Sequence, residues 1–175
     1  IASENYPQVE IVTTSGSFII ELDRNKAPLS VENFLGYVEE GFYANTIFHR
    51  VVPLTNKGHP FVIQGGDPTG TGSGGPGWWI PIEKSSLLHD FGVISMARAG
   101  DPDSAGCQFF ICLSREGTAR LDGQYCAFGE TVLGSGTIKS IAATPIQDPQ
   151  TGRPKDPPRI HRINMVPSAP RYPSR

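Results

Sequence analysis

The sequence is poor in cysteine and has no cluster of metal-binding residues. Its three cysteines, Cys107, Cys112 and Cys126, cannot all pair within one chain, and two stand in apolar stretches where a thiol behaves as a small hydrophobic group. We therefore expect free thiols, while a Cys112–Cys126 disulfide stays open if their two strands are neighbours. There is no Cys-x-x-Cys motif and the four histidines are scattered, so we predict no metal site.

The sequence also lacks an excess of basic charge and a long apolar run. The formal net charge is −2 and the isoelectric point is near 6.1, whereas proteins that bind nucleic acid need a basic excess. We therefore expect no nucleic-acid partner, and no membrane insertion, because no run approaches the roughly 20 apolar residues of a membrane helix. The first residues lack the basic and apolar regions of a signal peptide. A chain without an initial methionine fits a trimmed or a mature protein, so both cytoplasm and periplasm stay open.

What the sequence does contain is mainly alternation of apolar and polar residues. With 175 residues, a single domain can bury roughly 70% of its unfolded surface. The alternation predicts eight strands, at 8–14, 17–23, 47–52, 61–64, 92–98, 108–113, 125–132 and 159–166. After Pro28 the spacing of Val31, Phe34 and Val38 predicts a helix with Ser30 as N-cap, and a second short helix is predicted at 136–143.

These elements predict a mostly β fold. We expect an antiparallel β domain with two helices, closed as a barrel, because closure removes the exposed edges of an open sheet. Residues 8–166 would form a single domain, preceded by an N-terminal extension at 1–7 and followed by a Pro-rich C-terminal tail at 167–175.

Several local patterns have ordinary structural explanations. The glycine-rich segment 67–77 lacks the Gly-Lys-Ser/Thr ending of a phosphate-binding loop and is predicted to be a flexible rim loop. Ser104 and Ser114 lack the Gly-x-Ser-x-Gly elbow, which disfavours a serine hydrolase. Asp101 and Asp103 lack a calcium-binding loop and are interpreted as turn formers.

Three polar residues stand at the edges of apolar stretches. Arg50 lies in an apolar alternation, where a guanidinium either reaches water from the outer face or points its planar donors into a cleft. Gln64 follows one apolar run and Gln108 precedes another, and polar groups beside apolar walls need partners. Such a site would have hydrogen-bond donors beside an apolar pocket, but no nucleophile paired with a base and no metal. This combination suits chemistry that breaks no bonds.

At this point the chain resembles a known family from about residue 9 to residue 166, the cyclophilin-type peptidyl-prolyl cis-trans isomerases, in a divergent, bacterial-like form. Five ordered blocks carry the resemblance, which together are far more specific than any one of them. They are FHRVVP at 48–53, QGGD at 64–67, SMA at 95–97, QFFI at 108–111 and LDGQY at 121–125, followed by FG at 128–129.

The resemblance implies an eight-stranded barrel capped by two helices, with the proline site on its outer face. It implies rotation about X–Pro bonds in proline-containing polypeptides, assistance to protein folding, no cofactor and, we expect, a monomer. The implied catalytic residues are Arg50, Gln64 and Phe61. The implied substrate-binding residues are Val62, Ala97, Arg98, Gln108, Phe110, Arg120, Leu121 and Tyr125.

The sequence departs from the family pattern at three places. The segment 54–59 is an insertion before Phe61, which makes the assignment of Phe61 less secure than that of Arg50. Arg120 stands where many members have a tryptophan that helps to bind the cyclic peptide cyclosporin, so we expect weak inhibition by cyclosporin-type peptides. Tyr125 replaces the common pocket histidine but keeps a flat ring with a polar tip, so catalysis should survive.

Two other functions stay open. A non-catalytic binding module would follow if the insertion at 54–59 blocked the pocket, although proline docking alone needs no Arg50 donor. A barrel with an internal ligand cavity is the third hypothesis, and it is disfavoured because Phe18, Ile20, Phe110 and Phe128 are candidates to fill the interior.

Overall fold

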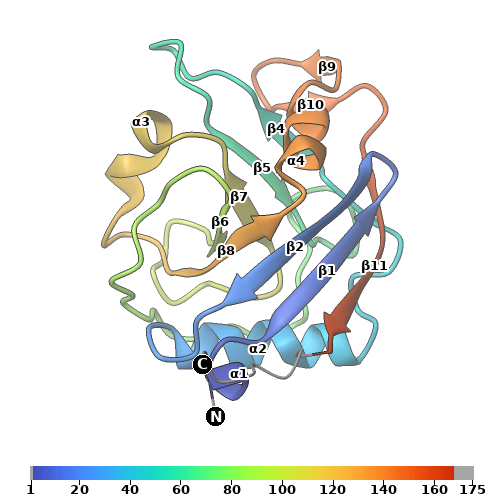
Figure 1. Ribbon diagram of the computed structural model, residues 1–175. Helices are drawn as coiled ribbons and strands as arrows, with labels where there is room; N and C mark the ends of the chain where they lie inside the picture. The colour runs from blue at the N-terminus through green and yellow to red at the C-terminus, as the bar shows by residue number, and fades with distance from the viewer. Residues whose placement is uncertain (1, 168–175) are drawn as a thin grey trace, which may run out of the picture.

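The fold is a strongly curled antiparallel sheet of nine strands around one main core (Figure 1). The computed structural model describes residues 2–167. The strand order is β3-β11-β1-β2-β8-β6-β7-β5-β4. The strands are β1 Gln8–Thr13, β2 Gly16–Leu22, β3 Thr46–Ile47, β4 Arg50–Val52, β5 Val62–Gly65, β6 Val93–Met96, β7 Phe109–Cys112, β8 Ala127–Leu133 and β11 Arg159–Val166.

The mostly β prediction is confirmed, and the main sheet has nine strands in place of the eight expected. The strand expected at 47–52 is divided at Phe48 and His49 into β3 and β4, which stand at opposite edges of the sheet. Within residues 2–167 these two edges do not pair with each other, so a closed hydrogen-bonded barrel is not observed. Because two residues connect the edge strands, the sheet curls until its two edges approach each other.

Two helices cover opposite ends of the curled sheet, as expected: α2 Pro28–Glu39 and α4 Ser135–Ala142 (Figure 1). Short helices α1 Ala2–Asn5, α3 Arg115–Thr118 and the 3-10 turn η1 Ala119–Leu121 were not predicted. Ser30 is not the N-cap of α2, which is Ala27. Instead the Glu83 carboxylate accepts hydrogen bonds from the backbone N–H groups of Leu29 and Ser30, both at 2.8 Å.

The sheet is buried on both faces where the middle strands run. On β7, Phe109 and Ile111 face the main core, whereas Phe110 and Cys112 belong to a second apolar cluster on the outer face. This alternation is the period-2 geometry of a strand. Phe110 therefore does not fill the interior, as the sequence had suggested, but Phe18, Ile20 and Phe128 do.

The remaining segments follow local turn chemistry. A small sheet of β9 Ile146–Asp148 and β10 Arg153–Pro154 interrupts the Pro-rich stretch before β11.

All three cysteines are free and buried. The expected N-terminal extension contains α1, and all of the expected tail except Pro167 lies outside the described residues. Within residues 2–167, no helix combines the length and apolar character that crossing a membrane requires.

Candidate active site

Arg50 lies on β4 and faces the outer side of the sheet beside β5. Its partner in the strand register is Gln64, whose Oε1 accepts a hydrogen bond from Arg50 Nη1 at 3.3 Å. Burial lowers the pKa of the half-buried Arg50 guanidinium, which nonetheless stays charged at neutral pH. The sequence left two alternatives for Arg50, a side chain that reaches into water or one that points its donors into a cleft. The structure shows the second.

The side-chain amides of Gln108 and Gln64 form a chain of hydrogen bonds, the amide relay, which orients the Gln64 oxygen toward Arg50. Gln108 Nε2 donates to the backbone carbonyls of Gly72 and Gly74, at 3.0 and 2.9 Å. Because carbonyls only accept, the Gln108 oxygen is left to accept from Gln64 Nε2, at 3.2 Å. The Gln64 oxygen then faces Arg50. The backbone of the glycine-rich loop thus determines the orientation of the Arg50 acceptor.

The glycine-rich loop is itself held by one buried carboxylate. Asp67 is 0% exposed, and its oxygens accept from the backbone N–H groups of Thr69, Gly72 and Gly74 at 2.7, 2.6 and 2.9 Å. Burial alone would raise the pKa of Asp67, but these hydrogen bonds lower it below its usual value. The loop prediction is confirmed, and three backbone hydrogen bonds join this loop to Asp67.

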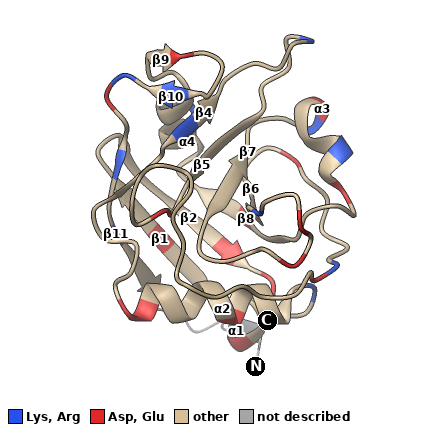
Figure 2. Ribbon diagram, turned by 180° about the vertical axis from the view of Figure 1, so that it is seen from behind, with Lys and Arg blue, Asp and Glu red and all other residues tan. Residues whose placement is uncertain are grey.

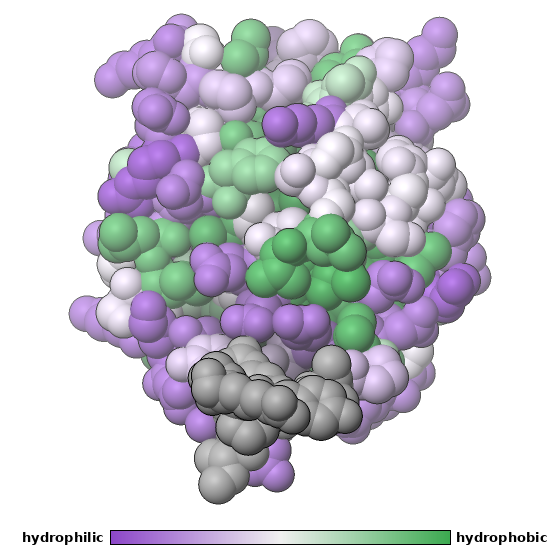
Figure 3. All heavy atoms as spheres, in the orientation of Figure 1, coloured by the Kyte–Doolittle hydropathy of each residue, from purple (hydrophilic) through white to green (hydrophobic). Residues whose placement is uncertain are grey.

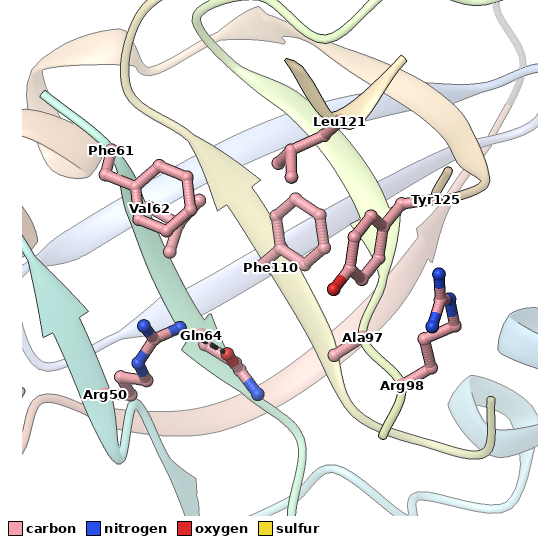
Figure 4. Close-up of a pocket in the computed structure, with 9 residues that line it drawn as sticks. All are labelled: Arg50, Phe61, Val62, Gln64, Ala97, Arg98, Phe110, Leu121 and Tyr125. Atoms are coloured by element: carbon pink, nitrogen blue, oxygen red, sulfur yellow. Dashed lines mark hydrogen bonds between the residues drawn. The ribbon is translucent and has the colours of Figure 1, made fainter. Parts of the chain in front are cut away.

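A pocket of about 110 Å³ has apolar walls and is bounded on one side by Arg50 and Gln64 (Figure 4). The Phe110 and Tyr125 rings meet edge to face, with centroids 5.7 Å apart. Figure 4 shows Arg50 and Gln64 on one side of the pocket and Tyr125 and Arg98 on the other. The lining residues are Arg50, Phe61, Val62, Gln64, Ala97, Arg98, Phe110, Leu121 and Tyr125.

Every site residue expected from the sequence lies in or next to this pocket. Nine line it directly, and Gln108 is joined to it through Gln64. Arg120 lies outside the lining, with its guanidinium carbon 5.1 Å from the centroid of the Phe61 ring. The Arg50 guanidinium carbon is 6.0 Å from the same ring. Phe61, the least secure assignment, is therefore brought next to Arg50.

The insertion at 54–59 folds back on itself. Thr55 and His59 exchange backbone and side-chain hydrogen bonds, and the Gly58 N–H donates to the Thr55 carbonyl at 2.9 Å. After the insertion, the Phe61 N–H donates a hydrogen bond to the Val52 carbonyl at 3.3 Å. No residue of the insertion lines the pocket. The insertion therefore leaves the register of β4 and β5 intact.

Sequence reasoning missed a buried hydrogen-bonded group behind the pocket wall. His89 stacks on Phe110 with ring centroids 6.0 Å apart, and its Nδ1 and Nε2 lie 3.0 Å from Asp122 Oδ1 and 2.9 Å from Ser95 Oγ. Ser95 is 0% exposed, so this trio cannot attack a substrate and instead supports the wall. Asp122 lies 33 residues from His89, and no local pattern indicated the pairing.

Arg98 completes the far side of the pocket. Its guanidinium carbon lies 4.4 Å from the Tyr125 ring centroid, and Nη2 donates to the Gln124 carbonyl at 2.9 Å. The stacked guanidinium restrains the Tyr125 ring, since cations over an aromatic face are attracted by its electrons. The site as a whole is a pocket with apolar walls between the guanidinium groups of Arg50 and Arg98. Among the lining residues there is no nucleophile paired with a base.

Comparison with known proteins agrees with this geometry. Residues 8–165 match the family model described as cyclophilin type peptidyl-prolyl cis-trans isomerase/CLD. Peptidyl-prolyl cis-trans isomerase-like 1 of Gibberella zeae is 37% identical, with 90% of this chain and 94% of that protein covered. Peptidyl-prolyl cis-trans isomerase ppi1 of Schizosaccharomyces pombe is 41% identical, over 87% of this chain and 94% of that protein. Both relatives are fungal, so they lend no support to a bacterial-like form.

Solved structures agree as well. A crystal structure of a Cryptosporidium parvum cyclophilin type peptidyl-prolyl cis-trans isomerase is 34% identical and superposes with a TM-score of 0.83, covering 94% of this chain and 99% of that chain. A second crystal structure of that protein, in the presence of the dipeptide Ala-Pro, gives a TM-score of 0.81. With the family model, the relatives and the fold in agreement, this chain belongs to the cyclophilin-type peptidyl-prolyl cis-trans isomerase family.

Proposed function

We propose that this protein catalyses rotation about X–Pro bonds in polypeptides and that Arg50 is its catalytic residue. The observation that carries the proposal is a half-buried guanidinium, held by Gln64, beside an apolar pocket. Peptide C–N rotation has a barrier of roughly 18–20 kcal/mol because the nitrogen lone pair is conjugated with the carbonyl. In the twisted state that lone pair is localised on nitrogen. A donor aimed at the nitrogen therefore binds the twisted state better than either planar isomer.

The other pocket residues have roles that follow from their positions. Phe61, Phe110 and Leu121 would hold the proline ring while the other side of the bond turns. Gln64 would orient Arg50, and Gln108 would orient Gln64. Val62, Ala97, Arg98, Arg120 and Tyr125 would complete the surface against which the polypeptide lies. The reaction needs no cofactor, because no bond is broken.

Proline-containing polypeptides are the proposed partners. Uncatalysed X–Pro exchange takes tens of seconds or longer and can limit folding, so the proposed biological role is assistance to protein folding. The Ala-Pro dipeptide used with the Cryptosporidium protein supports this substrate class. Residues 8–166 would act as one domain.

Two finer properties are also proposed. Binding of cyclosporin-type peptides should be weak, because Arg120 replaces the family tryptophan and lies against Phe61. A monomer is also proposed, and on the face in Figure 3 polar side chains separate the apolar patches.

A non-catalytic proline-binding module is the alternative. Such a module needs the apolar walls but not an oriented donor, so the amide relay that aims at Arg50 favours catalysis. An internal ligand cavity is disfavoured by the filled interior, where Phe18, Phe128 and Ile20 are fully buried.

The proposal is tested by the isomerisation rate of a short X–Pro peptide, followed by NMR exchange or a protease-coupled assay. Arg50→Ala should lower kcat/KM by roughly 100-fold or more, the cost of removing one transition-state donor. Arg50→Lys should lose nearly as much, because lysine lacks the planar fork. Equal rates in wild type and both variants would reject the mechanism. Peptide binding without turnover by the wild type would establish the binding module instead.

A further inference from the structure

The proline pocket continues past Arg50 into a second and larger cavity. This cavity has a volume of about 740 Å³ and lies between the glycine-rich loop at 71–73 and the β9–β10 hairpin at 147–153. It shares Arg50, Gln64 and Arg98 with the proline pocket, so the two adjoin, and we refer to them together as the groove. We call the part lined by Thr71, Ser73, Gln147, Asp148, Thr151 and Arg153 the hairpin cavity.

The hairpin cavity is built directly onto the strand that carries Arg50. The Val51 N–H donates to the Gly152 carbonyl at 2.8 Å, and β10 lies beside β4 (Figure 2). A Cβ placed on Gly152 would lie 3.1 Å from Arg50 Cγ. The hairpin therefore brings the Arg153 guanidinium to the same groove as the Arg50 guanidinium.

Arg153 is fixed in place but has donors left over. Its Nη1 donates to the Gly70 carbonyl, while its other guanidinium nitrogens have no hydrogen-bond partner among residues 2–167. This hydrogen bond restricts the Arg153 guanidinium before a ligand arrives. Its remaining N–H groups suit the two oxygens of a carboxylate.

The charge balance of the groove is positive. The acid that lines it is Asp148, whose Oδ1 already accepts from the Gln150 N–H at 3.0 Å. Burial lowers the pKa of His49, and Arg153 and Arg50 lower it further against the opposite effect of Asp67. His49 is therefore neutral near pH 7, and the positive charge comes from the arginines.

We infer that the hairpin cavity binds an acidic side chain of the substrate, a few residues from the isomerised proline, and that Arg153 is a specificity-determining residue. This inference rests on the proposed function. A pocket of about 110 Å³ accommodates little more than the proline itself, so the flanking polypeptide extends beyond it, and on the Arg50 side it would enter the hairpin cavity. The hydroxyl groups of Thr71, Ser73 and Thr151 would hydrogen-bond the polypeptide beside the carboxylate.

The experiment uses one X–Pro peptide in which a single Glu is moved through the positions on either side of the proline, with matched Gln and Lys peptides. At one position we expect Glu to raise kcat/KM roughly two- to fivefold over Gln, the size of a partly exposed ion pair, and Lys to lower it. The preference should shrink as salt is added, because exposed charges are screened. A Glu-to-Gln ratio of one at every position would overturn the inference.

Variants of the protein test whether Arg153 causes the preference for the Glu peptide over the Gln peptide. Arg153→Gln should bring the Glu-to-Gln ratio to one, Arg153→Lys should keep part of it, and Asp148→Asn should increase it. Lys155→Gln is the matched control, because Lys155 is an exposed cation two residues away that does not line the cavity. An unchanged ratio in a folded Arg153→Gln protein would contradict the assignment to Arg153.

A binding measurement separates this inference from the proposed function. NMR titration of the Thr151 and Gly152 amides with the same peptides gives the Glu-to-Gln affinity ratio with or without turnover. Neutral peptides that bind but do not isomerise would reject the proposed function alone. Isomerisation with no acid preference in rate or affinity would reject the inference alone.

Discussion

At the scale of single residues, the site depends on the direction of one guanidinium. Arg50 stands out in the sequence as a cation inside an apolar alternation, but only the family blocks indicated its role. Its direction comes from a chain of hydrogen bonds that starts at the Gly72 and Gly74 carbonyls and passes through Gln108 and Gln64. Each hydrogen bond in this chain fixes the orientation of the next side-chain amide. The Arg50 donor is therefore aligned before the substrate binds.

Removal of the central amide should loosen this alignment. We expect Gln64→Ala to lower kcat/KM roughly tenfold, because a hydrogen bond to a charged group contributes about 1.5–3 kcal/mol and part of the charge effect of Arg50 remains. The loss should be smaller than that of Arg50→Ala in the same peptide assay. Gln150→Ala, an exposed amide in the β9–β10 turn, is the control and should change little. A Gln64→Ala enzyme with the wild-type rate would show that the relay does not align Arg50.

At the scale of elements, the β9–β10 hairpin acts as a support for β4. Gly152 has φ of +76°, and a Cβ there would lie 3.0 Å from the Val51 carbonyl oxygen and 3.1 Å from Arg50 Cγ. Only glycine allows both the backbone conformation and the close approach. The hairpin should therefore affect catalysis without contacting the proline.

Gly152→Ala tests this support. We expect a loss of activity of at least about threefold, because Arg50 or the hairpin must move, in addition to the roughly 1 kcal/mol cost of a side chain at positive φ. Gly58→Ala is the matched control: its φ is +80°, with nothing within 4 Å of the added Cβ. The control should lose stability but keep its activity. Equal activity of both variants in the peptide assay would count against a role for the hairpin.

The N-terminus of α2 provides a second test at this scale. Glu83, more than fifty residues along the chain, accepts from two backbone N–H groups of the first turn, as capping side chains do. Glu83→Ala should lower the free energy of unfolding by about 0.5–2 kcal/mol in urea. Glu39→Ala, exposed in the last turn of the same helix, should change it far less. Similar losses in both variants would rule out the cap.

For the whole molecule, buried titratable groups link stability to pH. Burial is the main cause that lowers the pKa of both His49 and His89 from the ordinary 6.5. The unfolded chain therefore binds more protons than the folded one once the pH falls through 6.5. The stability that these histidines contribute is fully present above pH 6.5 and is lost as the pH falls toward their folded values.

Urea unfolding at about pH 7.5 and about pH 5.5 measures this effect. We expect lower stability at the acidic pH, with each histidine adding a slope of at most about 1.4 kcal/mol per pH unit. His89→Gln should flatten the dependence, because glutamine does not titrate. A second decline should follow below 3.8, where hydrogen bonds hold the pKa of Asp67 and Asp122 low. Stability that rises between pH 7.5 and pH 5.5 would contradict the burial argument.

The sequence by itself determined most strands of the main sheet, the two main helices and, through the family blocks, the membership of the pocket. Strand alternation and helix period are local properties, because each follows from the backbone geometry of neighbouring residues. Family blocks then placed Arg50, Gln64 and Phe110 on the right strands, and the structure brings them around one pocket.

Only the tertiary structure decided how these residues are held. Three contacts show this: the His89–Asp122 pair behind Phe110, the Glu83 cap of α2, and the close approach of Gly152 to Arg50. They join residues 33, more than fifty and 102 positions apart, respectively. The same holds for the curl that brings β3 and β4 to opposite edges of one sheet. Such contacts depend on how the whole chain packs, and no local period records them. One such contact, from Gln108 to the Gly72 and Gly74 carbonyls, makes the glycine-rich loop the anchor of the amide relay.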